Sequence, residues 1–201
     1  MPHEITPRRL WLGLRLWPIA LLVATSTSIA STSPHIRFTA VPAKCVNGKK
    51  DSTALSSVDD REIRWTEATK YDEARSWAQS RWYTSNNGLN KVKVAPDEAL
   101  TSNDLHWKDK KTADGALATW ERHGNIGATD YIYLNKHYLD GRGDWASDYW
   151  RRAAAAHEFG HALGFCHKGQ DKKSLMTPNM SEVASNQPTD YDRDAYHRLW
   201  G

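Results

Sequence analysis

The sequence predicts an α+β domain built on one small, mixed β-sheet. Two observations carry this prediction: apolar side chains alternate along several short stretches, as in strands, and recur at helical spacing along three longer ones. In chain order these patterns run strand, helix, several strands, helix, loop and helix, an order typical of the α+β class. The 201 residues show no internal repeat and no second domain, so we expect one domain over residues 61–201.

The first predicted elements are a strand, a helix and a second strand. Residues 61–65 (REIRW) alternate polar and apolar side chains, which suits a half-buried strand. Residues 66–83 predict a helix, because their apolar side chains recur at helical spacing: Ala74, Trp77, Ala78 and Trp82. Residues 90–96 (NKVKVAP) alternate again, and the proline ends that strand.

Two more strands and two helices complete the domain. Residues 116–120 (ALATW) and 130–135 (DYIYLN) predict strands. Residues 148–163 predict a helix, because they contain a run of four alanines with Arg and Glu, which are strong helix formers. The last helix is expected over residues 189–200, with a threonine at its N-cap and Asp192 three residues on as the partner in a capping box.

The N-terminal thirty residues predict an export signal. Three arginines precede an apolar run at residues 16–24 (LWPIALLVA), and small side chains at Ser28 and Ala30 suit cleavage after Ala30. The run is about half the roughly 20 residues that a membrane span needs. We therefore expect a secreted, extracellular protein with no stable membrane association after cleavage. Residues 31–60 show no sustained period and are interpreted as an extended, partly mobile lead-in segment.

The charge of the mature chain excludes an electrostatic case for nucleic acid or for an anionic membrane. The formal net charge is +3, and residues 1–30 carry three arginines and Glu4, so the remainder holds 3 − 2 = +1. The charged run at residues 168–173 (KGQDKK) is interpreted as a solvated loop. We expect a monomer that binds protein or peptide.

Two cysteines, Cys45 and Cys166, leave two hypotheses open. In an exported protein a lone pair of cysteines is most simply one disulfide. The other hypothesis is a free Cys45 thiolate that rests on a metal until its segment is removed.

A histidine-rich stretch, AAAAHEFGHALGFCH at residues 153–167, predicts a metal site. Residues four apart lie on one face of a helix, so His157 and His161 can direct two imidazole nitrogens to one metal ion. Glu158 projects roughly 100° further round the helix. It is poorly placed to be a ligand but can reach a water molecule held by the metal.

Gly164 allows the third histidine to join the other two. Glycine readily takes the left-handed conformation that ends a helix, so the chain can fold back and bring His167 to the same point. Three neutral imidazoles leave a fourth position open, which is typical of a catalytic zinc site. We expect one catalytic Zn²⁺ held by His157, His161 and His167.

The spacing H-E-x-x-H-x-x-G-x-x-H, followed by a methionine turn, resembles the metzincin zinc peptidases. The turn is SLMTP, with Met176 nine residues after His167. Pro178, the chain end YDRDAYHRLWG and the stretch DYIYLN are similar to the matrixins, the matrix-metalloproteinase type, and indicate a secreted member of bacterial type. The resemblance implies a zincin fold with an edge strand over the cleft, three main helices and a small C-terminal subdomain after the zinc helix.

The resemblance also implies an activity and roles for further residues. The protein would be a zinc-dependent endopeptidase in which Glu158 is the general base toward the water and Met176 forms an apolar floor under the histidines. Asp192 would hold the methionine turn or serve only the helix cap. The substrate would lie extended on an edge strand, and the first pocket beyond the scissile bond would have its own wall. The expected substrate-binding residues are Tyr131, Tyr133 and Asn135 for the strand, and Pro178, Asn179 and Met180 for the wall.

The sequence departs from the animal matrixins in two places. The pro-domain switch PRCG is not recognisable, and AKCVNG around Cys45 is a weak match to it. The loop that holds a second zinc and calcium is not evident either, so neither ion is expected. The weak candidates for such a site are His106, Asp109, Asp114 and His123. Two other functions stay open: a secreted zinc amidase acting on cell-wall crosslinks, and a non-catalytic binding protein on the same fold.

Overall fold

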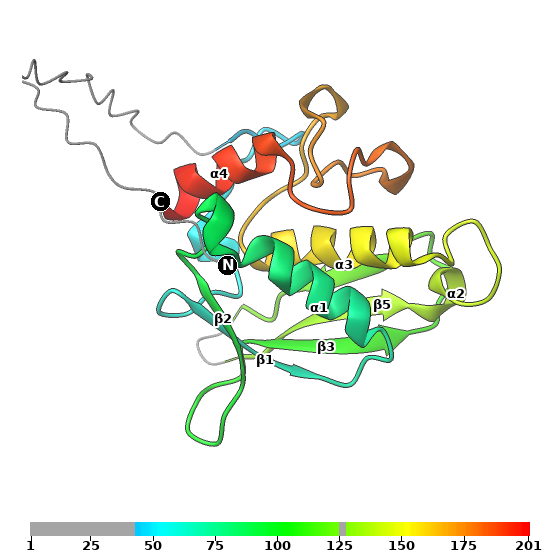
Figure 1. The fold of residues 1–201 in the computed structure, drawn as a ribbon, viewed down its shortest axis with the longest axis horizontal. Coiled ribbons are helices and arrows are strands. Elements are labelled where there is room, and N and C mark those ends of the chain that lie inside the picture. Colours follow the sequence, from blue (N-terminus) through cyan, green and yellow to red (C-terminus); the bar gives the residue numbers. More distant parts are fainter. Residues whose placement is uncertain (1–42, 125–127) are drawn as a thin grey trace, which may run out of the picture. The chain divides into compact units, whose positions relative to one another are not determined.

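A mixed five-stranded β-sheet runs through the protein in a computed structural model that describes residues 43–124 and 128–201 (Figure 1). The spatial order is β2-β1-β3-β5-β4; all neighbours are parallel except β4 and β5, which are antiparallel. The strands are β1 (Glu62–Glu67), β2 (Lys93–Pro96), β3 (Leu105–Lys110), β4 (Ala118–Glu121) and β5 (Asp130–Asn135).

Helices α1 and α3 cover one face of the sheet (Figure 1). The helices are α1 (Asp72–Trp82), the single turn α2 (Lys136–Leu139), α3 (Asp148–Ala162) and α4 (Asp190–Trp200). The short 3₁₀ turns are η1 (Thr53–Leu55), η2 (Ser85–Asn87), η3 (Gln170–Lys172) and η4 (Met180–Glu182). The expected α+β class with three main helices is confirmed, and α3 and α4 begin and end within one residue of the predicted limits.

Small side chains let α1 and α3 pack closely. The four alanines Ala153–Ala156 are fully buried, and the indole N–H of Trp82 on α1 donates to the carbonyl oxygen of Ala156 at 2.8 Å. An alanine stripe lets the two backbones approach, and the tryptophan then fills the space beside it. This packing fixes the axis of α3, which carries two of the three histidines.

The sequence analysis missed one central strand, β3. Its residues LHWKDK contain only two strongly apolar side chains, Leu105 and Trp107, but both are fully buried under the helices. The side chains of His106 and Lys108 point to the other face, as strand alternation requires.

The sequence analysis assigned the edge of the sheet to the wrong strand. Residues 130–135 do form β5, but β3 pairs with one side of it and β4 with the other, so its main-chain groups are already bonded. The strand at this edge of the sheet is β4. It follows β3 in the chain, runs antiparallel to β5 and pairs with the side of β5 that would otherwise be free. Tyr131, Tyr133 and Asn135 therefore cannot receive a substrate as an added strand.

The N-terminal part of the domain differs from the expected lead-in segment. The predicted signal peptide and its cleavage after Ala30 lie outside the described residues. From Ala43 onward, however, the chain packs on the domain instead of extending away from it. We call residues 43–52 the strap; it contains a bridge between Lys44 and Lys50, and the buried side chain of Asp51.

The strap is attached to the histidine segment at several points. A disulfide joins Cys45 to Cys166 across 121 residues of sequence. The amide of Val46 donates to the carbonyl of His167 at 3.0 Å, and the amide of Ser52 donates to that of Gly164 at 3.0 Å. A disulfide and main-chain hydrogen bonds thus hold the strap to the domain, rather than the packing of a continuous apolar face.

Gly164 ends α3 in the left-handed region, with φ of +91°. A Cβ atom at this position would overlap the carbonyl oxygen of Ser52 in the strap. The glycine therefore serves twice: it reverses the chain, and it leaves room for the strap backbone.

No helix among residues 43–124 and 128–201 has the length and apolar character to cross a bilayer.

Substituting Gly164→Ala should lower the free energy of unfolding by about 3 kcal/mol, since the alanine meets both a left-handed backbone and the strap. Urea denaturation measures the change. Gly143→Ala is the matched control, because nothing lies within 4 Å of a Cβ there and its φ is not positive. Equal stability of the two variants would contradict the proposed role of Gly164.

The disulfide should protect both cysteines from alkylation. Alkylation of the unreduced, denatured protein is expected to add no label, whereas prior reduction should add one label at Cys45 and one at Cys166; mass spectrometry counts them. Replacing both cysteines with serine should lower the free energy of unfolding by about 2–4 kcal/mol, because the closed loop is long. Label on the unreduced protein would instead favour free thiols.

Candidate metal centre

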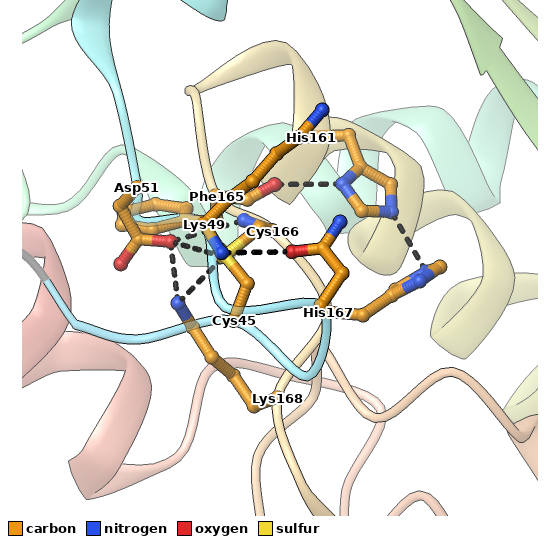
Figure 2. The surroundings of a disulfide bond; sticks show 9 residues. Cys45, Lys49, Asp51, His161, Phe165, Cys166, His167 and Lys168 are labelled. Carbon is orange, nitrogen blue, oxygen red and sulfur yellow. Dashed lines mark hydrogen bonds and ion pairs between the residues drawn. A yellow bond between two sulfur atoms is a disulfide. The ribbon is translucent and has the colours of Figure 1, made fainter.

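Two main-chain carbonyls orient the histidines of α3. The Nδ1 atom of His157 bonds the carbonyl of Leu175 at 2.8 Å, and that of His161 bonds the carbonyl of Phe165 at 2.7 Å. A carbonyl oxygen only accepts, so both Nδ1 atoms carry the proton and both Nε2 atoms keep a free lone pair. Figure 2 shows the His161 bond.

The third histidine completes a triad. The Nε2 of His167 lies 3.1 Å from the Nε2 of His157 and 3.1 Å from that of His161. Nitrogen ligands at about 2.05 Å from a tetrahedral zinc ion lie about 3.3 Å apart, so the spacing fits this ion. The reversal at Gly164 brings His167 under the helix as the sequence analysis expected.

The surroundings keep the imidazoles neutral. Burial lowers the pKa of His157 to about 4 and that of His161 to about 4, and it also lowers the pKa of His167. A metal ion binds the neutral imidazole, so burial removes proton competition around neutral pH. The donor set, its spacing and its protonation all fit zinc.

Met176 lies fully buried beneath the triad, against Gly160 of α3. A Cβ atom at Gly160 would overlap the methionine sulfur, so the glycine makes room for it. Asp192 of α4 holds this turn: its carboxylate accepts from the hydroxyl of Ser174 and, at 2.8 Å, from the amide of Leu175. The same carboxylate accepts from the N-cap amide of α4, so both expected roles of Asp192 are present.

Glu158 faces the open side of the triad. Its Oε2 atom accepts a hydrogen bond from the amide of Trp120 at 2.7 Å, and only 9% of the residue is exposed. Burial raises the pKa of this carboxyl, while His161 and the Trp120 amide act to lower it. A buried carboxylate beside the open side of the triad is suited to take up a proton.

A cavity of about 730 Å³ opens at the triad and Glu158. The edge strand β4 and the segment before it line one part, and the segment after the methionine turn lines another: Pro178, Asn179 and Met180. These three residues thus border the cavity at the triad, and their place beyond a scissile bond stays a prediction.

The three residues expected on the substrate strand do not line this cavity. Tyr131 and Tyr133 stack on each other with centroids 5.8 Å apart, on β5. Asn135 is fully buried, and its amide nitrogen donates to the carbonyls of Thr112 and Ala116, each at 2.8 Å. Asn135 therefore shapes the loop that precedes β4 and does not bind substrate directly.

The candidate residues for a second metal site do not come together in the described part of the chain. His106 bonds the hydroxyl of Thr66, and Asp109 accepts from that of Thr69. Within the described ranges these two, Asp114 and His123 form no cluster of three or more ligand atoms.

Two residues beside the triad were missed. Lys168 was assigned to a solvated loop, but it is 1% exposed and paired with Asp51 of the strap. The charged run gave no indication of this pair, because no local feature of the sequence distinguishes the buried lysine from the exposed ones. The Trp120 amide that bonds Glu158 also left no signal in the sequence.

Comparisons with known proteins identify the family. Among solved structures the chain is similar to the ECX AB5 holotoxin in its GM1-bound form, with a TM-score of 0.49, 11% identity, and coverage of 76% of this chain and 84% of that one. It is also similar to archaemetzincin from Archaeoglobus fulgidus complexed with malonate, with a TM-score of 0.38, 12% identity, and coverage of 69% and 99%. Comparison with curated proteins gives no match. The matrixin family profile matches residues 60–201, and the chain belongs to this family of zinc metallopeptidases.

Proposed function

We propose that the protein is a secreted, zinc-dependent endopeptidase that hydrolyses peptide bonds in extended protein substrates. The observation that carries the proposal is the convergence of three imidazole Nε2 atoms beside a cavity that Glu158 also lines. Secretion is supported by the export signal expected at residues 1–30 and by the Cys45–Cys166 disulfide.

The residues divide the work of hydrolysis. Zinc, when bound by the triad, lowers the pKa of a water ligand and polarises the scissile carbonyl. The carboxylate of Glu158 then takes a proton from the attacking water and returns this proton to the leaving amine. The Trp120 amide orients that carboxylate.

The substrate adds to the sheet at β4. Among the described residues this strand is paired only with β5, so its other side can bind an extended peptide through main-chain hydrogen bonds. The Trp120 amide already points from β4 toward Glu158, which places the catalytic carboxylate next to the bound strand. Pro178, Asn179 and Met180 then form the wall of the first pocket beyond the scissile bond.

Two substitutions should separate chemistry from metal binding. Glu158→Gln is expected to keep stoichiometric zinc and lower kcat by about a thousandfold, since it removes the proton acceptor but no ligand. His161→Ala should lose the zinc itself. Metal analysis and turnover of a casein-type substrate measure both effects; wild-type turnover by the Glu158→Gln protein would refute the mechanism.

Chelation should separate the substrate classes. The mature protein is incubated with mixed protein and with purified cell wall, each with and without a zinc chelator. We expect new amino termini from protein only, lost with the chelator and restored by added zinc. Release from the wall alone would favour an amidase, and no release from either would favour a binding protein.

A further inference from the structure

A second cavity, of about 240 Å³, borders the metal centre. It shares Trp120, His161 and His167 with the larger cavity, but its other walls come from the strap, Leu55 and the turn after α3. Pro178 to Met180 line the larger cavity, and the proposed function assigns them to the side that follows the scissile bond. The second cavity therefore suits the part of a substrate that precedes the bond.

The interior of this cavity is apolar. Its lining includes the disulfide, Phe165, Val46 and Leu55. Val46 is 57% exposed and Leu55 is 48% exposed, an unusual degree for large apolar side chains. Two such side chains around one cavity beside the active centre favour the docking of an apolar group.

The rim of the cavity is basic. Lys49 and Lys50 line it, and the strand-like bridge between Lys44 and Lys50 brings a third exposed lysine to the same hairpin. In the described residues none of the three forms an ion pair, and the strap's one acid, Asp51, is turned inward to Lys168. The surface beside the cavity thus presents uncompensated positive charge.

The strap is attached beside the triad, so the backbone positions from which its lysines extend are fixed. The disulfide and the Asp51–Lys168 pair connect it to residues 166–168, as Figure 2 shows. The Val46–His167 bond is a third connection. The strap also lies outside residues 60–201, the part that matches the matrixin family.

We propose that the strap forms a substrate subsite on the side before the scissile bond, and that it selects acidic peptide segments carrying one apolar side chain. The apolar side chain enters the cavity, while Asp or Glu residues next to it meet Lys49 and Lys50. The upstream residues 31–42 contain an arginine and no acid, so charge complementarity favours an external peptide over the chain's own segment. This inference rests on the proposed peptidase function.

The test uses peptide pairs built on a sequence that the protein cuts. Two of the four residues before the scissile bond are Glu in one peptide and Gln in the other. For the wild-type protein we expect kcat/KM to be about fivefold higher for the Glu peptide at low ionic strength. The ratio should fall toward one in about 0.5 M salt, because the charges lie at the surface.

Two variants locate the effect. Lys49→Gln combined with Lys50→Gln should bring the ratio to about one. Lys93→Glu lowers the net charge of the chain by the same two units, but on β2, at the edge of the sheet opposite β4, and should keep the wild-type ratio. A double variant that keeps the preference, or a wild-type ratio of one, would overturn the subsite.

Binding separates this inference from the proposed function. Fluorescence anisotropy with labelled peptides is measured in the zinc-loaded Glu158→Gln protein, where turnover is not needed. A several-fold lower Kd for the Glu peptide, lost on replacing both strap lysines, supports the subsite even if no peptide is cut. Equal Kd values for both peptides would refute it even if cleavage is rapid.

Discussion

Two hydrogen bonds to main-chain carbonyls determine the geometry of the metal centre. Leu175 and Phe165 each offer a carbonyl oxygen to the Nδ1 of a histidine on α3, and so they fix the tautomer and the direction of each ring. Both carbonyls lie after the helix, on the chain that has folded back beneath it. The reversal at Gly164 therefore positions His167 and also provides the groups that orient the other two histidines.

The metal ligands could be predicted from the sequence because their spacing is local. One helical turn separates His157 from His161, and a glycine followed by three residues reaches His167, so no long-range contact needs to be known. Helices α3 and α4 followed equally well from their composition and caps. Helix α1 begins at Asp72 and not at residue 66, because residues 66 and 67 belong to β1. Residue identity and short-range geometry were sufficient for this part of the site.

The sheet order could not be read in the same way. Strand β5 was predicted with correct limits, yet its place in the sheet depends on β3 and on the return of β4, both distant in sequence. β3 itself has two buried apolar residues among four polar ones, a weak signal for a central strand. Register and edges are long-range properties, so the edge strand was assigned to the wrong segment.

The strap shows a second limit of sequence reasoning. Its ten residues include three lysines, an asparagine and a glycine, a composition typical of solvated coil, and a core position for Asp51 has no local signature. Its order comes from a disulfide, two main-chain bonds and one buried ion pair. Such attachments depend on partners more than a hundred residues away, which composition does not reveal.

The carboxylate of Asp192 secures both ends of the segment between the methionine turn and α4. It bonds Ser174 and Leu175 at one end and the N-cap of the helix at the other. The intervening residues, which include the cavity-lining residues 178–180, are thereby held at both ends by one side chain. Because longer loops add little closure entropy, evolution can lengthen or remodel this segment, and so change which side chains the enzyme accepts, without disturbing its chemistry.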